Sequence, residues 1–253
     1  MIKFFRKIRY NLIEKNKTGK YLKYAIGEII LVVIGILIAL QINNWNESRK
    51  QKQQTRTNIL SIAKDISNDT VLQQRIIKSL KKEVTAGELL IPIMESEQQI
   101  IQDSLDFILK FNDLTTVYVI PDETNTWSLL KSSGVLSEFP DAKLLNMLQD
   151  YYNSYFNLST NFSNSANESR LEIRKLKYEL FSDSDHKKFF PTNTPKAPSK
   201  KAFEAIFNDE KILPLCRFIR GGAFYFEPKF ELVNKKAHDI INYIHKNYKP
   251  IAS

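Results

Sequence analysis

An uninterrupted apolar run near the start of the chain constrains the fold more than any other feature. Residues 29–40 carry no polar side chain, and the next charged residue is Glu47. A helix from Tyr21 to Trp45 would be about 37 Å long at roughly 1.5 Å per residue, which exceeds the about 30 Å hydrocarbon core of a bilayer. The run therefore predicts a transmembrane helix, which we assign to residues 25–45.

The flanks of this run favour a membrane span over the buried helix of a soluble protein. Residues 1–24 hold eight Lys or Arg and one acidic residue, so this tail carries +7 of the +9 net charge. Tyr24 and Trp45 bracket the run as interfacial aromatic residues do. A cleaved signal peptide fits less well, because the positive region is long and no small-x-small cleavage site follows. We interpret the run as an uncleaved signal anchor.

The same charges predict the orientation of the chain. Basic residues before a span favour a cytoplasmic N-terminus, although four more basic residues soon after the span weaken this asymmetry. We expect residues 1–24 to form a basic cytoplasmic tail and residues 46–253 a helical extracytoplasmic domain. Because the positive charge is concentrated beside the span, we expect membrane lipid as a partner of the tail and no nucleic acid.

Four residues in or beside the span are candidates for helix packing or membrane contact. Glu28 lies one turn inside the span, where a charge is costly unless it is paired. Gly35 and Ala39 form a small-xxx-small pair that allows two helices to approach closely, and Trp45 marks the interface. The small-residue pattern is common by chance, so it gives only a weak indication of self-association.

Residues 24–47 and the opening Met1-Ile2-Lys3-Phe4-Phe5 closely resemble the start of a family of uncharacterised membrane proteins from Bacteroidota, the domain of unknown function sixty-ninety. A looser second match covers residues 127–136 and the downstream Tyr151-Tyr152. The resemblance implies a bacterial (Gram-negative) inner membrane and a periplasmic domain. It implies no activity, and no functional residue is carried over from the family.

Helical patterns dominate the rest of the chain, so we expect an all-α fold in which the anchor helix is followed by a helical-bundle soluble domain. A strict heptad repeat from Ile59 would place Asp69 and Gln73 at core positions, so an ordinary amphipathic helix is favoured over a coiled coil. The expected helices cover residues 88–111, 126–131, 202–208 and 229–248, together with a long helix that Asp141 caps and that bends or breaks within 157–169. Expected interruptions are a loop over 186–201, the pair Leu213-Pro214, and a turn at Arg220-Gly221-Gly222.

Two aromatic groups could form a ligand or partner surface, although core packing is the ordinary explanation for both. The first is the stripe that contains Tyr151 and Tyr155. The second combines Arg217 and Arg220 with the aromatic residues around them, and it could bind an anionic or aromatic ligand.

No signature of catalysis, cofactor binding or metal binding stands out. The segment Asp183-Ser184-Asp185-His186 reads as a solvated acidic turn, since a metal site needs three or four converging ligands. The single cysteine, Cys216, has no local signature of a nucleophile. We therefore expect no enzyme and no cofactor, an interpretation that a meeting of Asp185, His186 and Cys216 in space would overturn.

These features favour a membrane-anchored periplasmic interaction or scaffolding protein without catalytic activity. Its partner would be another protein or a second copy of the chain. The alternative is a membrane-tethered helical ligand-sensing module that acts through a membrane partner, because helical bundles bind small molecules between their helices.

Overall fold

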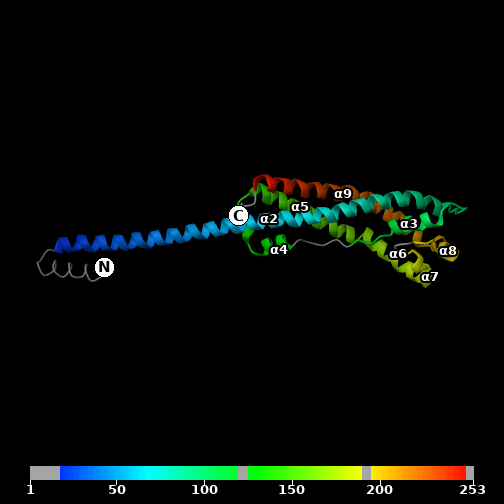
Figure 1. The fold of residues 1–253 in the computed structure, drawn as a ribbon, viewed down its shortest axis with the longest axis horizontal. Helices are drawn as coiled ribbons and strands as arrows, with labels where there is room; N and C mark the ends of the chain where they lie inside the picture. Colours follow the sequence, from blue (N-terminus) through cyan, green and yellow to red (C-terminus); the bar gives the residue numbers. More distant parts are fainter. Residues whose placement is uncertain (1–17, 119–124, 190–194, 249–253) are drawn as a thin grey trace. The chain divides into compact units, whose positions relative to one another are not determined.

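The computed structural model describes residues 18–118, 125–189 and 195–248, and all regular structure in these ranges is helical (Figure 1). The all-α prediction is therefore confirmed. The elements in order are α2 (Thr18–Glu95), α3 (Ser104–Leu114), α4 (Asn125–Ser132), the short 3-10 helix η1 (Val135–Glu138), α5 (Ala142–Ser163), α6 (Ala166–Leu180), α7 (Asp183–Phe189), α8 (Lys200–Asn208) and α9 (Ile212–Asn247).

The chain divides into two compact units, Met1–Thr57 and Asn58–Ser253, and α2 contributes to both. The division does not test the predicted boundaries at 24/25 and 45/46, and most of the predicted basic tail, residues 1–17, lies outside the described residues.

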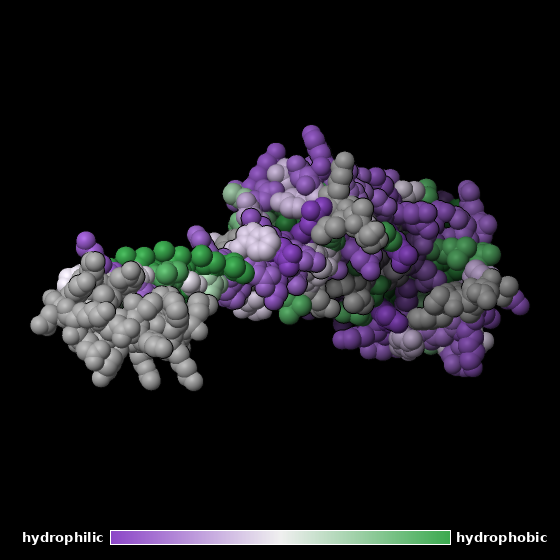
Figure 2. All heavy atoms as spheres, turned by 60° about the vertical axis from the view of Figure 1, so that its left-hand side comes forward, coloured by the Kyte–Doolittle hydropathy of each residue, from purple (hydrophilic) through white to green (hydrophobic). Residues whose placement is uncertain are grey.

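The N-terminal part of α2 exposes nearly all of its apolar side chains. Figure 2 shows hydrophobic residues covering this stretch, and Trp45 is 66% exposed. Within the described ranges this is the one helix long and apolar enough to cross a membrane, and none of its most apolar window is buried in the protein. A dense band of exposed Ile, Val and Leu is unfavourable in water and suits a lipid environment.

The core of the second unit consists of two apolar clusters. The first lies between α2, α4, α5 and α9 and includes Ile59, Leu148 and Phe230. The second lies between α2, α3, α6, α8 and α9 and includes Phe111 and Ile219. Helices α2 and α9 therefore contribute to both clusters.

The buried residues of α2 follow a heptad repeat, with alternating steps of three and four residues. The positions in this repeat are Ile59, Ile62, Ile66, Gln73, Ile76, Leu80, Glu83, Gly87, Leu90 and Met94, with the half-buried Asp69 completing the series. The other buried residues, Ala63, Thr70, Ala86 and Ile91, lie directly beside one of these positions. Such steps keep one seam of a helix facing its neighbours. The heptad that begins at Ile59 is therefore present, and it packs against helices of its own domain.

Two helix boundaries around α5 follow from local sequence, as predicted. The Asp141 carboxylate accepts a hydrogen bond from the Leu144 N–H at 2.9 Å and so caps the start of α5. Helix α5 ends at Ser163 and α6 begins at Ala166, inside the Asn- and Ser-rich segment where a break was expected.

The predicted helix over 88–111 is wrong, because α2 continues through Pro92 to Glu95 and α3 starts only at Ser104. Pro92 lies on the exposed face of α2, where its ring does not disturb the packed core. Buried residues on the opposite face keep the helix intact through this position. The carboxylate of Asp103 then accepts hydrogen bonds from the N–H groups of Leu105 and Asp106 and starts α3.

The predicted interruptions at Leu213-Pro214 and at Arg220-Gly221-Gly222 are also wrong, since both lie within α9. Pro214 falls in the first turn, where its missing N–H is not needed. The glycines stay helical because neighbouring side chains, among them Ile219 and Ala223, are fully buried. The predicted loop over 186–201 is only partly correct, because α7 extends to Phe189 and α8 begins at Lys200.

Two helical glycines make a matched pair for a stability test. A Cβ at Gly87 would collide with the Cβ and Cγ atoms of Arg220, whereas a Cβ at Gly221 would meet no described residue within 4 Å. We expect Gly87→Ala to destabilise the protein by about 1–3 kcal/mol through overpacking. Gly221→Ala should stabilise the monomer by roughly 1 kcal/mol, because alanine favours the helix.

Denaturant unfolding of the full-length protein in detergent measures both changes. Equal effects of the two substitutions would contradict the close approach of α9 to α2 at Gly87.

Candidate functional site

The outward face of α9 carries an apolar stripe that no part of the described chain covers. We call Phe218, Gly221, Phe224, Tyr225 and Leu232 the α9 stripe. Phe218, Tyr225 and Leu232 are 53%, 58% and 57% exposed and follow one another at intervals of seven residues. Scattered exposed hydrophobic residues are ordinary, but an aligned row of large ones is typical of an interaction surface.

Charged side chains border the α9 stripe. The Lys229 ammonium lies 4.3 Å from the centroid of the Tyr225 ring, a cation–π contact that leaves the ring exposed. On the opposite border, Glu231 pairs with Lys81 of α2 at 2.7 Å. The stripe is thus an apolar centre with a charged rim, which is the usual composition of a protein interface.

The structure separates the two arginines that sequence reasoning grouped together. Arg217 is half-exposed and its guanidinium pairs with Glu95 at 2.6 Å. The stem of Arg220 crosses over Gly87, and its Nε is buried without a hydrogen-bond partner among the described residues. The two side chains therefore do not converge on a common anion site, and the aromatic residues beside them supply the exposed surface.

Tyr151 and Tyr155 lie in the first core cluster, as the core-packing explanation describes. Tyr151 is fully buried, and its hydroxyl donates to the Asp69 carboxylate at 3.1 Å and accepts from the Gln73 amide at 3.0 Å. The Asn234 amide donates in turn to Gln73 Oε1 at 3.2 Å. Burial raises the pKa of Asp69 to about 6, although the Tyr151 hydrogen bond lowers it.

A second buried polar group lies between the two core clusters. Glu83 of α2 and Arg170 of α6 form a fully buried ion pair, and the Tyr118 hydroxyl donates to Glu83 at 2.6 Å. The Arg170 guanidinium lies over the rings of Tyr118 and Phe162, with centroids at 5.3 and 5.1 Å. Burial raises the pKa of Glu83 to about 7, against the attraction of Arg170.

The backbone at Tyr118 is hydrogen-bonded to α6 beside this ion pair. The Tyr118 N–H donates to Asn167 Oδ1 at 3.0 Å, and the Asn167 amide donates to the Tyr118 carbonyl at 2.9 Å. These two hydrogen bonds satisfy the N–H and carbonyl groups of Tyr118 and help to hold its ring over Arg170. Both Glu83 oxygens and two of the three Arg170 nitrogens are bound within the group, while Arg170 Nη1 is buried without a hydrogen-bond partner among the described residues. The mutual pairing of the two side chains indicates a structural role.

Lys177 and Cys216 lie close together in the second cluster. The Lys177 ammonium donates to Thr115 Oγ1 at 2.5 Å and to Asn112 Oδ1 at 3.0 Å, and neither acceptor carries a charge. Burial therefore lowers the pKa of Lys177 to about 7. Burial also raises the pKa of the Cys216 thiol to about 12, which keeps it protonated and unreactive at neutral pH.

The lowered pKa of Lys177 predicts how stability depends on pH. Between about pH 7 and pH 10.5 the unfolded chain binds this proton and the folded chain does not, so the free energy of unfolding rises with pH in that window. We expect a gain of a few kcal/mol between pH 7 and pH 9.5. Lys177→Met should remove most of this slope, as urea titrations at both pH values would measure. An unchanged slope would assign the pH dependence to other groups.

Asp185 and His186 contact different residues from those that surround Cys216. The Asp185 carboxylate accepts from the N–H and hydroxyl of Ser199 at 2.7 and 2.8 Å. Although burial opposes it, these hydrogen bonds hold the pKa of Asp185 at about 2. The His186 ring stacks on Tyr178, with centroids 4.6 Å apart. Among the described residues no group of three or more His, Cys, Asp or Glu could hold a metal ion.

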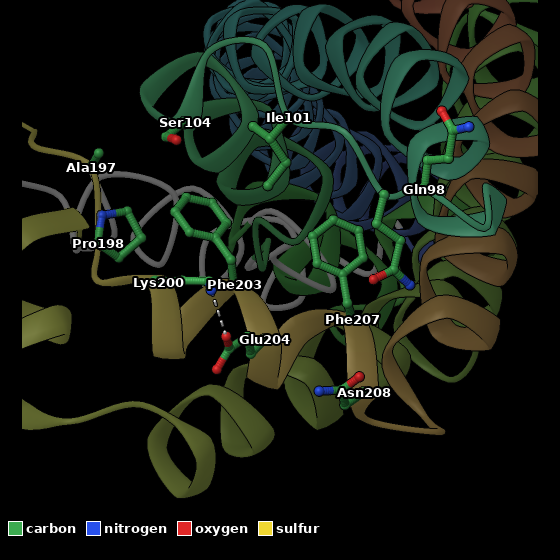
Figure 3. A pocket seen from close by; sticks show the side chains of 11 residues that line it. Gln98, Ile101, Ser104, Ala197, Pro198, Lys200, Phe203, Glu204, Phe207 and Asn208 are labelled. Atoms are coloured by element: carbon green, nitrogen blue, oxygen red, sulfur yellow. Dashed lines mark ion pairs between the residues drawn. The ribbon is translucent and has the colours of Figure 1, made fainter.

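A pocket of about 470 Å³ lies between the segment that follows α2 and helix α8 (Figure 3). Phe203 and Phe207, one turn apart on α8, point toward residues 98–104, and Phe107 packs against both rings. Its two charged lining residues, Lys200 and Glu204, pair with each other at 3.6 Å. The remaining lining side chains are uncharged: Gln98, Gln99, Ile101, Ser104, Ala197, Pro198 and Asn208.

Sequence reasoning missed this pocket because its two sides are far apart in the chain. Gln99 has a left-handed backbone, with φ at 45°, which is unusual for a residue other than glycine. Its N–H bonds to the Ser96 hydroxyl at 3.0 Å, so a tight turn places Gln98 and Gln99 over α8. The nearest signal in the sequence was the pair Phe203 and Phe207 at helical spacing.

The candidate residues of the predicted span lie along the exposed part of α2. Glu28 is half-buried, Ala39 is exposed, and a Cβ at Gly35 would meet nothing within 4 Å. The Arg49 guanidinium lies 5.5 Å from the Trp45 ring centroid, a pairing that suits a membrane interface. Gly35 and Ala39 therefore leave room for a second helix, and their role in packing stays a prediction.

Together these features define an all-helical protein in which, among the described residues, one helix has membrane-spanning length and α9 carries an apolar stripe. The chain belongs to a family of unknown function (DUF6090), whose model matches residues 28–213. The match covers most of the chain and confirms the resemblance found in the opening segment. Comparison with curated proteins and with solved structures found no match.

Proposed function

We propose that this protein is a non-catalytic, membrane-anchored interaction or scaffolding protein. In this proposal α2 anchors it in the bacterial inner membrane, the N-terminus is cytoplasmic, and the helical domain lies in the periplasm. The observation that carries the proposal is the α9 stripe, since large apolar side chains on an outward helix face gain most when a partner covers them.

The buried polar groups support a non-enzymatic role. The Asp69 and Glu83 carboxylates both have shifted pKa values, but each is already bound by partners within the core. A catalytic group must reach a substrate within hydrogen-bond distance. The described pocket offers only a Lys200–Glu204 pair, and these residues neutralise each other on its rim.

Site-specific photocrosslinking in the native membrane tests the proposal. A photoreactive amino acid replaces Tyr225 in the α9 stripe or, as a matched control, Tyr178 of α6, which is 60% exposed. We expect protein crosslinks from position 225 and few from position 178, with the products identified by mass spectrometry. Equal or absent crosslinking at the two positions would overturn the proposal.

A reporter fused after Ser253 tests the orientation separately. Because Lys and Arg before the span favour a cytoplasmic N-terminus, we expect activity from a reporter that works only in the periplasm. Activity from a reporter that works only in the cytoplasm would reverse the proposed topology without affecting the α9 stripe.

The second candidate function is ligand sensing through a membrane partner, which the pocket over α8 favours. Its volume falls within the usual range for small-molecule sites, roughly 300–1,000 Å³. Phenylalanine rings on one side and amide groups on the other suit an uncharged ligand that carries a ring and hydrogen-bonding groups. The pocket does not involve Tyr151 or Arg217.

Ligand binding can be tested with a library of uncharged ring compounds against the full-length protein in detergent. We expect hits detected by saturation-transfer NMR to lose at least about tenfold in affinity in Phe207→Ala, because the ring forms one side of the pocket. Phe156→Ala, which removes an exposed ring of α5, should leave binding unchanged. Compounds whose affinity is unchanged by both substitutions would bind outside this pocket, and this result would rule out the second candidate function.

A further inference from the structure

We infer that the α9 stripe pairs with the α9 stripe of a second copy of the same chain, as two parallel helices in register. The inference rests on the proposed function and names the partner of that surface. It would make the protein a homodimer through α9.

The spacing of the stripe identifies the occupant as a helix. Phe218, Tyr225 and Leu232 are separated by seven residues, and Gly221 and Pro228 fall three residues after the first two of them. Alternating steps of three and four residues form the seam of a coiled coil. A flat surface or an extended segment would not require this repeat.

The buried face of α9 shows the same repeat, which makes the helix two-sided. The buried positions in this repeat are Ile212, Cys216, Ile219, Ala223, Phe226, Phe230, Val233, Ala237, Ile240 and Ile244, and Asn234 is buried beside them. We call the exposed repeat Phe218, Gly221, Tyr225, Pro228 and Leu232 the outer seam. Each of its large residues lies two positions after a buried residue, which is about 200° around the helix. One seam packs in the bundle, and the other faces directly away from it.

Gly221 lies in the outer seam between Phe218 and Tyr225. Glycine inside a helix costs roughly 1 kcal/mol relative to alanine, and no atom of the described residues would lie within 4 Å of a Cβ at this position. A residue without a side chain lets a second helix approach closely. This glycine is therefore explained by a neighbour outside the chain.

The rims of the seam fit a second copy in the parallel sense. One rim carries Lys229 and Lys236, and the other carries Phe224 and Glu231. In a parallel pair, residues five positions apart meet across the interface, which sets Glu231 against Lys236 and Phe224 against Lys229 of the other copy. An antiparallel pair would instead set the lysine rims against each other.

Glu231 and Lys236 already form ion pairs within their own chain. In the dimer, each side chain would therefore interact with two partners. Glu231 bonds Lys81 at 2.7 Å, and Lys236 bonds Asp150 at 2.8 Å. Three large side chains per copy bury less than the about 800 Å² per partner of a standard interface. A shared membrane compensates, since anchored copies meet at a high effective concentration.

Disulfide trapping in native membranes tests the inference. The wild-type chain has one cysteine, the fully buried Cys216, and gives the baseline. Phe218→Cys, Tyr225→Cys and Leu232→Cys are each oxidised with copper phenanthroline, which takes two electrons and two protons from each pair of thiols. We expect covalent dimers from all three, at least about fivefold above Tyr178→Cys, a control of equal exposure.

A second substitution distinguishes a specific contact between two α9 stripes from random collisions of chains in the membrane. Gly221→Leu, combined with Tyr225→Cys, should lower trapping about tenfold by preventing close approach, while Gly221→Leu combined with Tyr178→Cys stays at baseline. Circular dichroism confirms that both double variants remain helical. Unchanged trapping would overturn the inference.

The outcomes distinguish this inference from the proposed function. Dimers that form only between a Phe218→Cys chain and a Leu232→Cys chain would overturn the parallel register. Baseline trapping, together with photocrosslinks from position 225 to a different protein, would overturn self-pairing and leave the proposed function in place. Baseline trapping without such photocrosslinks would remove both.

Discussion

Replacing Arg170 with methionine is expected to lower the free energy of unfolding by about 3–5 kcal/mol. The substitution leaves the Glu83 carboxylate buried with only the Tyr118 hydroxyl as a partner. A buried charge that loses its counter-ion cannot recover its hydration. Urea unfolding of the full-length protein in detergent, followed by the fluorescence of the buried Trp127, measures the change.

Two further variants show whether charge causes this loss. Combining Glu83→Gln with Arg170→Met removes both charges and should recover most of the stability, because the amide can still bond Tyr118. Arg217→Met breaks the half-exposed pair with Glu95 and should cost at most about 1 kcal/mol. If Arg170→Met cost no more than Arg217→Met, the buried ion pair would have no special role.

The second large effect is expected from Phe162→Ala, which should cost about 3–5 kcal/mol. The Phe162 ring is fully buried and meets Phe226 and Phe230 edge-on, with centroids 5.2 and 5.6 Å away. It also lies beneath the Arg170 guanidinium. The substitution therefore opens a cavity and removes a cation–π contact at the junction of the two core clusters.

Phe156→Ala is the matched control, because it removes the same side chain from the same helix. Phe156 is 46% exposed, so its loss should change stability by no more than about 0.5 kcal/mol. The same urea experiment compares the two variants. A small loss for Phe162→Ala would mean that the surrounding helices collapse into the space.

The fold class could be predicted from the sequence because apolar periodicity reports directly on burial. Ile59, Ile62, Ile66, Ile76 and Leu80 recur at helical spacing in the sequence, and all five are buried. Asp69 and Gln73 are polar, so the sequence alone disfavoured a heptad repeat from Ile59 that places both of them in the core. They fit because Tyr151 and Asn234, far away in the sequence, satisfy their hydrogen bonds.

Helix boundaries near proline and glycine could not be predicted from local signals. Gly221 and Pro228 would usually end or bend a helix, yet α9 continues because its other face is buried along its whole length. That burial depends on contacts with distant helices, which local sequence does not encode. The pocket over α8 was missed for the same reason, since Gln99 and Phe207 meet only in the folded chain.

Helix α9 also determines when the domain can fold during synthesis. It supplies apolar side chains to both core clusters, yet it is synthesised after all the other described helices. Until then, α2, α5 and α6 expose faces that aggregate readily. A chain that stops before residue 212 completes neither cluster, so a partly folded intermediate with exposed apolar surface persists until α9 has been synthesised.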